Sequence, residues 1–433
     1  MPLTSDAGLV RAIGARQLTA SIVNVTIGAG IFVLPAVASA GLGAAAPIAY
    51  VVCAAVMALI VCCFAAAGSR VSLTGGIYAY VETAFGPFVG FLAGVLYFVT
   101  ATFAVASVSN AFAGSIGALW PAAASPAARA VVIGGLFAML AIVNVRGVTP
   151  GVRVVEIMAI AKLLPLLILV VGGIWLVNPV YLRWEGLPGA ASIGQTAIVL
   201  IFAFVGLEVA LVPSGEVRDP ARTVPRALFS ALAITTTLYL LIQTVAQGLL
   251  GAAMASFATA PLAEAAGRVL GQGGRLLVLL GAVVSMFGYV SGDMLGSPRT
   301  LFAFARAGVL PATIARVHPR FHTPYIAIVL HACIVASVSI SSSFRQLAVL
   351  ANVAALTLYL MCVTASYELQ RRDVRTDGAI PFAVPGGPVI PILAAAAIVW
   401  LLSNATRREF GVEALVLAVA TLFYFIRRTG GQL

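Results

Sequence analysis

The sequence predicts an all-α polytopic membrane protein with twelve transmembrane helices. Of its 433 residues, 61% are hydrophobic and only 9% are charged, and the mean hydropathy is +1.08. A soluble domain of this size could not cover so apolar a chain with polar surface. The apolar residues also gather into separate runs of about 20 residues, the length that crosses a bilayer as a helix.

The apolar runs follow one another along the whole chain with short polar connections. They cover residues 17 to 38, 44 to 68, 86 to 118, 128 to 146, 153 to 177, 192 to 214, 226 to 250, 274 to 307, 324 to 341, 346 to 368, 388 to 404 and 411 to 427. No polar stretch is long enough for a separate domain, so we expect one integrated bundle over residues 1–433. The even number of runs places both chain ends on the same side of the membrane.

The arginines indicate which side this is. Counted between the predicted spans, 17 arginines fall on the side of the N-terminus and 7 on the other, and Lys162 completes the 25 basic residues. Cytoplasmic loops carry the excess of positive charge, so we expect both termini in the cytoplasm. The Ala-, Val- and Arg-rich composition suggests a bacterium, and hence its cytoplasmic (inner) membrane.

The first span contains a stretch that favours an interruption. Within NVTIGAGIFVLP, residues 24 to 35, the segment Gly28-Ala29-Gly30 lies where a spanning helix should be regular. Each glycine costs a helix about 0.5–1 kcal/mol relative to alanine. Irregular backbone at membrane depth is tolerated where it lines a cavity or binds a ligand. We therefore predict a binding site at Gly28 to Gly30.

The sixth span repeats this pattern. In FAFVGLEVALVPSGE, residues 202 to 216, Gly206 and Pro213 interrupt the apolar run. The first and sixth spans are five apart, which is the spacing expected if residues 17–177 and 192–368 form two inverted repeats of five spans each. Residues 388–427 then add two further helices. The third and eighth spans are the longest, which predicts tilted supporting helices.

Two interrupted helices can bind a zwitterion. Half-helix N-termini present free N–H groups and C-termini present free C=O groups, so together they can hold a carboxylate and an ammonium. An amino acid is the simplest ligand with both groups. Phe202 and Phe204 could close the cavity over its side chain while Ala203 leaves room for it, although core or lipid-facing positions are the alternative for these aromatics.

Three ionisable residues lie inside predicted spans. Lys162, the only lysine, is nine residues from Arg153, or about 13 Å along a helix. That is deep for a lysine that reaches the membrane surface, and such a residue costs about 2.5–3.5 kcal/mol, so a functional role is favoured over snorkelling. Burial would let its amine load and release a proton. Glu208 and Asp293 could serve as partner or relay, or be carboxyls held by backbone hydrogen bonds.

Several other functions are excluded by missing motifs. A P-loop needs Gly-Lys, and the only lysine follows Ala161, so energy must come from an ion gradient, from exchange or from a partner protein. No Ser/His/Asp set, HExxH or CxxC is present, which argues against an enzyme, a metal or another cofactor. Pro319 and Pro324 argue against a helix that would align His318 and His322, which disfavours a zinc site. His331 is expected to be a packed, hydrogen-bonded histidine. The scattered basic residues do not form a nucleic-acid surface.

Five motifs together resemble one transporter family. They are TIGAGIFVLP at residues 26 to 35, GGIYAYVETAFGPFVGF at 75 to 91, FAFVGLE at 202 to 208, GEVRDPARTVPRA at 215 to 227 and SPRTLFAFARAGVLP at 297 to 311. In this order they are similar to the amino acid–polyamine–organocation (APC) transporters. The resemblance implies the LeuT-like fold, a ten-helix core of two inverted repeats with interrupted first and sixth helices, and two further helices.

The resemblance also implies roles for particular residues. The substrate carboxylate would meet backbone amides at Gly28 to Gly30. Its amine would meet carbonyls near Ile27 and those of Phe202, Ala203 and Val205. The substrate-binding set is then Thr26, Ile27, Gly28, Ala29, Gly30, Phe202, Ala203, Phe204, Val205 and Gly206. Phe202 matches an aromatic gate. Lys162 matches the lysine that replaces a sodium ion between the first and eighth helices in proton-coupled members.

These observations favour a proton-coupled symporter of a small neutral or hydrophobic amino acid, working by alternating access in a lipid bilayer. Its partners would be the amino acid and protons, and a single sequence does not specify an oligomeric state. Asp293 and Glu208 keep open an exchanger or importer of cationic amino acids or polyamines. A channel or receptor with the same pocket is the alternative from another class.

Overall fold

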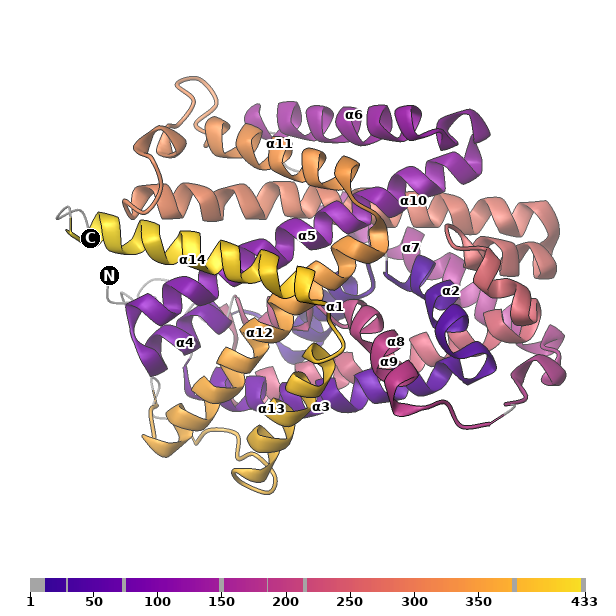
Figure 1. The fold of residues 1–433 in the computed structure, drawn as a ribbon, viewed down its shortest axis with the longest axis horizontal. Coiled ribbons are helices and arrows are strands. Elements are labelled where there is room, and N and C mark those ends of the chain that lie inside the picture. The colour runs from indigo at the N-terminus through magenta and orange to yellow at the C-terminus, as the bar shows by residue number, and fades with distance from the viewer. Residues whose placement is uncertain are drawn as a thin grey trace.

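The computed structural model describes residues 12–28, 30–71, 75–147, 152–184, 186–212, 216–375 and 380–429. Over these residues the chain is helical apart from turns and one isolated bridge between Ile13 and Val217 (Figure 1). The α-helices are α1 (Ala15–Thr26), α2 (Gly30–Leu42), α3 (Ala46–Arg70), α4 (Ile77–Phe85), α5 (Pro87–Leu119), α6 (Pro126–Val145), α7 (Val152–Gly173), α8 (Ala190–Leu200), α9 (Pro220–Leu250), α10 (Pro261–Arg306), α11 (Tyr325–Ser341), α12 (Phe344–Arg371), α13 (Val389–Leu402) and α14 (Arg407–Thr429). Short 3₁₀ helices connect them, among them η5 (Ile201–Ala203), η6 (Leu207–Leu211), η8 (Gly251–Ser256) and η9 (Ala312–Ala315).

The helices follow the predicted apolar runs. Each of the twelve predicted ranges overlaps at least one observed helix. In the described part of the chain, eight helical stretches are long and apolar enough to cross a membrane, while α11, α13 and the described apolar part of α7 are shorter. The all-helical class is therefore confirmed, and twelve crossings remain a prediction.

Two helical segments were not predicted. Helix α4 is only nine residues long and lies between Gly76 and Gly86, whose φ angles are 59° and 89°. Helix α10 begins 13 residues before the predicted span and bends at Gly271, where φ is 62°. A search for runs of about 20 apolar residues misses segments that are this short or that carry charges such as Glu264.

The interior of the bundle is formed by a subset of helices. In the most apolar 18-residue window of α12, 72% of residues are buried, against 6% in α14. Helix α12 packs against α5 and α3, and α3 packs against α9. Helices α6 and α11 pack side by side along α5 and α10 in Figure 1. The most buried helices thus surround the two predicted interruptions, and α14 lies outside them.

The two interrupted segments lie against each other in opposite directions. Helix α1 contacts η6, whereas α2 contacts α8 and η5. The first half of one segment therefore meets the second half of the other. This antiparallel pairing is what inverted repeats require.

Candidate functional site

The first interruption separates α1 from α2. Helix α1 ends at Thr26, and Ile27 has a non-helical backbone with φ −77° and ψ 75°. The Gly28 amide donates to the Thr26 carbonyl over 2.8 Å, which closes a tight turn. Gly30 is already the first residue of α2. The irregular backbone therefore includes Ile27 and Gly28, while Ala29 lies outside the described residues.

The second interruption lies between α8 and η6. Helix α8 gives way to η5 at Ile201, and residues 204–206 form a turn. Gly206 has φ 113°, a conformation that L side chains rarely adopt, and a Cβ there would lie 3.3 Å from Val25 Cγ1. Glycine is thus needed at position 206 for backbone conformation and for the close approach of α1. The predicted breaker Pro213 falls outside the described residues.

A tyrosine from α9 joins the two interruptions. The Tyr239 hydroxyl lies 3.0 Å from the Thr26 carbonyl oxygen and 2.8 Å from that of Ala203. One hydroxyl proton serves both acceptors, which are carbonyls at the ends of α1 and η5. The Thr26 carbonyl also accepts from the Gly28 amide. The family resemblance implied that the Ala203 carbonyl would bind a substrate amine, and nothing in the sequence had marked Tyr239. In this structure the tyrosine already binds that carbonyl.

Two further polar groups lie near this junction, of which Thr26 was predicted as a site residue and Gln243 was not. Gln243 is fully buried, and neither of its amide atoms forms a hydrogen bond among the described residues. The Thr26 hydroxyl is buried and equally without a hydrogen bond there. Tyr239, Gln243 and Gln247 recur every four residues and so share one face of α9. That spacing inside an apolar run was the available signal.

Lys162 lies at the end of α1. Its side chain is 7% exposed, and Nζ donates a hydrogen bond to the Asn24 carbonyl. This carbonyl is one of the last four of α1, which lack partners within the helix, and a cation is favourable at a helix C-terminus. Helix α7 itself packs against α10 and α9.

Glu208 holds the second interruption in shape. Its Oε2 accepts from the Gly206 amide over 2.9 Å and from the Tyr359 hydroxyl over 2.6 Å. The carboxyl is 4% exposed. Two donors on one oxygen suit an acceptor, and they bind the carboxyl to its own backbone and to α12. This is the backbone-held arrangement that the sequence left open as the alternative to a relay.

The side chain of Asp293, a residue of α10, binds a residue of α11 and not the backbone of the interruptions. Its Oδ2 lies 2.7 Å from His331 Nε2, and its Oδ1 accepts from the Ser297 hydroxyl over 2.6 Å. Among the described side chains, no ion pair joins Lys162 to Asp293 or Glu208. His331 is packed and hydrogen-bonded as expected, but its carboxylate partner was not foreseen, because 38 residues separate the two.

The aromatic residues at the second interruption have different surroundings. Phe202 is 7% exposed and meets Phe344 of α12 edge to face, with ring centroids 5.8 Å apart. Phe204 is fully buried against Tyr239 at 5.4 Å, which is the core packing considered as its alternative. Val205 is partly exposed. Of the predicted aromatics, Phe202 has the position suited to a gate.

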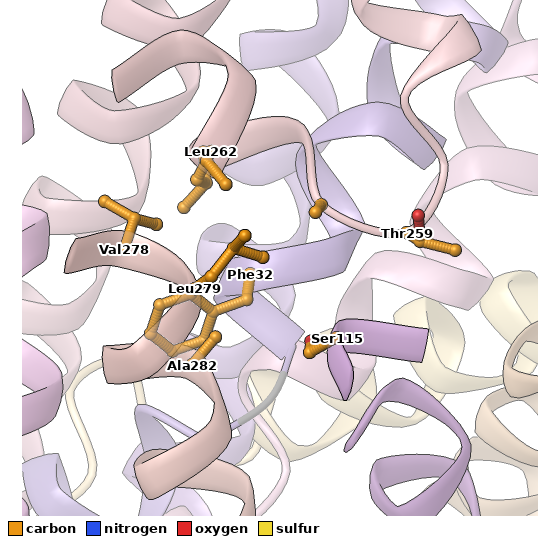
Figure 2. Close-up of a pocket in the computed structure, with 9 residues that line it drawn as sticks. Phe32, Ser115, Thr259, Leu262, Val278, Leu279 and Ala282 are labelled. Atoms are coloured by element: carbon orange, nitrogen blue, oxygen red, sulfur yellow. The ribbon is translucent and has the colours of Figure 1, made fainter. Parts of the chain in front are cut away.

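A small hollow lies on the α2 side of the first interruption. Its empty volume is about 190 Å³, and it is lined by Phe32, Ser115, Thr259, Ala260, Leu262, Ala263, Val278, Leu279 and Ala282. Figure 2 shows Phe32 beside Leu279, with Ser115 and Thr259 as the polar groups of its wall. Phe32 is two residues beyond Gly30, so the surface that continues from the interruption is apolar.

Together, these features define a class of protein. Two antiparallel, interrupted helices inside a membrane bundle present free backbone groups to each other and to buried polar side chains. This arrangement is typical of secondary transporters, which bind their substrates at discontinuous helices near the membrane midplane.

Comparison with known proteins identifies the family. Residues 13–423 match the model of the amino acid permease family. The chain therefore belongs to this family of the APC superfamily and is an amino acid transporter of the membrane, not an enzyme. Membership also implies the LeuT-like fold.

Three bacterial relatives match nearly the whole chain. The methylthioribose transporter of Bacillus subtilis (strain 168) is 28% identical over 98% of this chain and 94% of its own length. The serine/threonine exchanger SteT of the same organism is 27% identical, with 93% and 92% covered. Its branched-chain amino acid permease BcaP is 27% identical, with 93% and 89% covered.

Proposed function

We propose that the protein is a proton-coupled symporter of a small neutral or hydrophobic amino acid that works by alternating access. The observation that carries this proposal is the position of Lys162, whose amine caps the end of α1 three residues before the first interruption. The C-terminal end of α1 would then bind the titratable amine of Lys162 and also contribute to the backbone site for a zwitterion.

The proposed substrate site uses the backbone of both interruptions. The carboxylate would bind N–H groups at the start of α2, where the helix dipole favours negative charge. The amine would bind carbonyls at the ends of α1 and η5, displacing the Tyr239 hydroxyl from at least one of them. The site residues would be Thr26, Ile27, Gly28, Ala29, Gly30, Phe202, Ala203, Phe204, Val205 and Gly206.

The surroundings support a neutral substrate over a cationic one. The carboxyls that motivated a polyamine or cationic amino acid, Glu208 and Asp293, each already accept two hydrogen bonds from the protein. A cationic substrate would have to break these bonds to bind either carboxyl. The apolar wall at Phe202 and Phe32 favours an uncharged side chain. Two of the relatives are named for serine/threonine and branched-chain amino acids.

Coupling would follow from movement of α1. While α1 is in place, the Asn24 carbonyl stabilises the Lys162 ammonium. A buried ammonium that loses this acceptor is costly, so proton release would accompany movement of α1 away from α7. Proton and substrate would thereby be linked, because both bind the same helix end.

We further propose the topology that completes this transporter. Twelve crossings, with repeats at residues 17–177 and 192–368 and two helices at 388–427, would leave both termini in the cytoplasm of a bacterium. The antiparallel contact of the two interrupted segments supports the inverted repeats.

Ligand-induced thermal stabilisation tests the substrate. Purified protein is heated with each of the twenty amino acids, with several polyamines and with methylthioribose. We expect a small neutral or hydrophobic amino acid to raise the unfolding temperature, since a ligand that binds only the folded state stabilises it. Stabilisation by polyamines alone would contradict the proposal. Saturable uptake with counterflow in proteoliposomes separates a transporter from a channel or receptor.

Substitution of Lys162 tests the coupling. In Lys162→Ala we expect uptake to lose its pH dependence while substrate binding partly persists, because the backbone site remains. Lys162→Arg is the matched variant, since it keeps a donor and a charge but does not titrate. Uptake by Lys162→Arg should also lose its pH dependence. Uptake by both variants that rises and falls with pH as in the wild type would exclude Lys162 as the coupling residue.

A further inference from the structure

A buried acid–histidine pair joins α10 to α11. His331 is fully buried, and the Asp293 side chain is 8% exposed. The 2.7 Å contact joins Asp293 Oδ2 to His331 Nε2, and the Ser297 hydroxyl binds the other carboxyl oxygen. The remaining ring nitrogen, Nδ1 of His331, is buried and has no hydrogen bond among the described residues. We propose that Asp293 and His331 form a second proton-binding site, distinct from Lys162, whose added proton resides on His331 Nδ1.

The hydrogen bonds determine where that proton goes. A contact of this length between a carboxyl oxygen and a ring nitrogen contains one proton, and the carboxyl's other oxygen already accepts from Ser297. Without a further proton, the pair is a carboxylate with a neutral imidazole and carries one negative charge. One more proton makes the pair neutral overall and places N–H on both ring nitrogens. Nδ1 is the free basic position, because Nε2 and both carboxyl oxygens are occupied.

The surroundings make this single charge energetically important. An unpaired negative charge in a membrane interior is expensive, and a proton removes it. A protonated Nδ1, however, is a buried donor that needs an acceptor, which the observed packing does not give it. A proton therefore stabilises the pair by removing its negative charge. The same proton also favours a change in packing that would give the Nδ1–H group an acceptor. Proton affinity then differs between conformations, which is the condition for coupling.

The helices around the pair carry other titratable and charged groups. Tyr97 on α5 and Tyr289 on α10 lie near enough to interact electrostatically with both Asp293 and Glu208. Phe98 of α5 covers the imidazole, with ring centroids 5.6 Å apart. The described parts of the other helices packed on α10 and α11 add Lys162 on α7, Arg129 and Arg146 at the ends of α6, Arg222, Arg226 and Tyr239 on α9, Tyr325 and Cys333 on α11, and the charged residues of α10 itself (Glu264, Arg268, Arg275, Arg299 and Arg306). Within these helices, Asp293 and His331 form the only acid–histidine contact of the described residues.

Tyr289 connects the pair to the first interruption. A Cβ at Gly28 would lie 3.6 Å from the Tyr289 ring, so this ring covers the irregular backbone between α1 and α2. Asp293 is four residues further along α10 and therefore on the same face, about 6 Å along the helix axis. A shift of α10 driven by the pair would move Tyr289 against Gly28. This link to transport rests on the proposed function, whereas proton binding by the pair does not.

Nitrogen NMR of histidine tests proton binding directly. The chain has only three histidines, and His318 and His322 lie in the connection between α10 and α11. In protein labelled with ¹⁵N-histidine, the signals lost in His331→Gln belong to His331. We expect its Nδ1 signal to change from unprotonated to protonated when spectra recorded from a pH of about 9 to a pH of about 5 are compared. In Asp293→Asn the transition should move to lower pH, because the carboxylate no longer favours the added charge. An Nδ1 signal that stays constant over this range would overturn the proposal.

Uptake measurements separate this site from Lys162. We expect His331→Gln and Asp293→Asn to change the pH profile of uptake similarly, and the double variant to match either single one, since the two residues bind one proton together. His322→Asn, which removes a loop histidine and suits its φ of 53°, should leave the profile unchanged. A uniform decrease of uptake at every pH in His331→Gln would show a packing role only. If Lys162 variants keep their pH dependence while the pair's variants lose it, the proposed coupling residue fails and the pair stands.

Discussion

The Tyr239 hydroxyl is the one side-chain group that binds carbonyls of both interruptions in the described structure. In Tyr239→Phe the ring contacts with Phe204 and Tyr50 remain, and only this hydroxyl is lost. We expect the free energy of unfolding to fall by about 1–3 kcal/mol, because the buried Ala203 carbonyl loses this donor while the Thr26 carbonyl keeps only the Gly28 amide. Thermal unfolding in detergent measures this loss.

Tyr50→Phe is the matched control for that substitution. The Tyr50 hydroxyl is buried and has no hydrogen bond among the described residues, so its removal should change stability little. Equal destabilisation by the two variants would mean that the Tyr239 hydroxyl contributes no more than a hydroxyl without partners.

The glycines of the first interruption differ in the space around them. A Cβ at Gly30 would lie 3.1 Å from Leu34 Cδ1 and 3.4 Å from Ala203 Cα, whereas at Gly28 its nearest contact is 3.6 Å. We expect Gly30→Ala to weaken substrate binding more than Gly28→Ala, because α2 must approach the second interruption closely. Valine at either position should abolish binding by blocking the backbone. Binding is followed by thermal stabilisation with the best ligand, and normal affinity in the valine variants would argue against a backbone site.

At the residue scale, the sequence predicted the features that depend on neighbouring residues in the chain, namely the helix interruptions and the ionisable residues inside apolar runs. Glycine and proline patterns indicated both interruptions, and hydropathy marked Lys162, Glu208 and Asp293 as unusual. The partners of these residues come from distant parts of the chain: Asn24 for Lys162, Tyr359 for Glu208 and His331 for Asp293. Such pairings depend on how helices pack, which no local pattern contains.

At the element scale, the loop after α12 is tied to the end of α3. Asp373 binds Arg375 through two hydrogen bonds of 2.8 and 3.0 Å and binds Arg70 at 3.1 Å. The Arg375 and Arg70 guanidinium groups hold the pKa of Asp373 below its ordinary value. The carboxylate therefore stabilises the fold above the ordinary aspartate pKa, and this contribution is lost as the pH falls through the lowered one.

Asp373→Asn tests this contact and keeps the backbone preference, because Asn also tolerates the φ of 48° at this position. We expect the variant to unfold at a slightly lower temperature than the wild type at neutral pH. The difference should be small, since Asp373 is 59% exposed. It should decline below a pH of about 3.9, the ordinary aspartate pKa, and disappear only below the lowered pKa of Asp373. A difference that is the same at every pH would show that charge is not its cause.

Element boundaries were predictable where a helix is long and apolar. Helix α5 begins and ends within one residue of its predicted span, residues 86 to 118. The first span became two helices, α1 and α2, as its glycines indicated. Helix α4 was missed because it is too short to cross a bilayer and is set by glycines with positive φ at both ends.

At the scale of the whole molecule, orientation in the membrane follows from charge. The 17 arginines on one side against 7 on the other predict that residues beyond α14 lie in the cytoplasm. A pair of reporter fusions at the C-terminus, one active only in the cytoplasm and one only outside it, would measure this. We expect activity from the cytoplasmic reporter alone, and activity from the other would reverse the proposed topology.

The architecture itself was predictable from hydropathy and from five family motifs, because a bilayer restricts a chain to spanning helices. The packing of those helices was not. The antiparallel contacts of α1 with η6 and of α2 with α8 join segments that are far apart in the chain. Their details depend on side chains such as Tyr239, which only their spacing distinguishes in the sequence.

The single lysine has a practical consequence for observing the protein at work. Lys162 carries the only side-chain amine of the chain, and in this structure that amine is buried against the Asn24 carbonyl. An amine-selective acylating reagent therefore has one internal target, which it can reach only when the packing around Lys162, including its contact with the end of α1, opens. The rate at which the native protein becomes acylated thus measures how often this packing opens, without any engineered label.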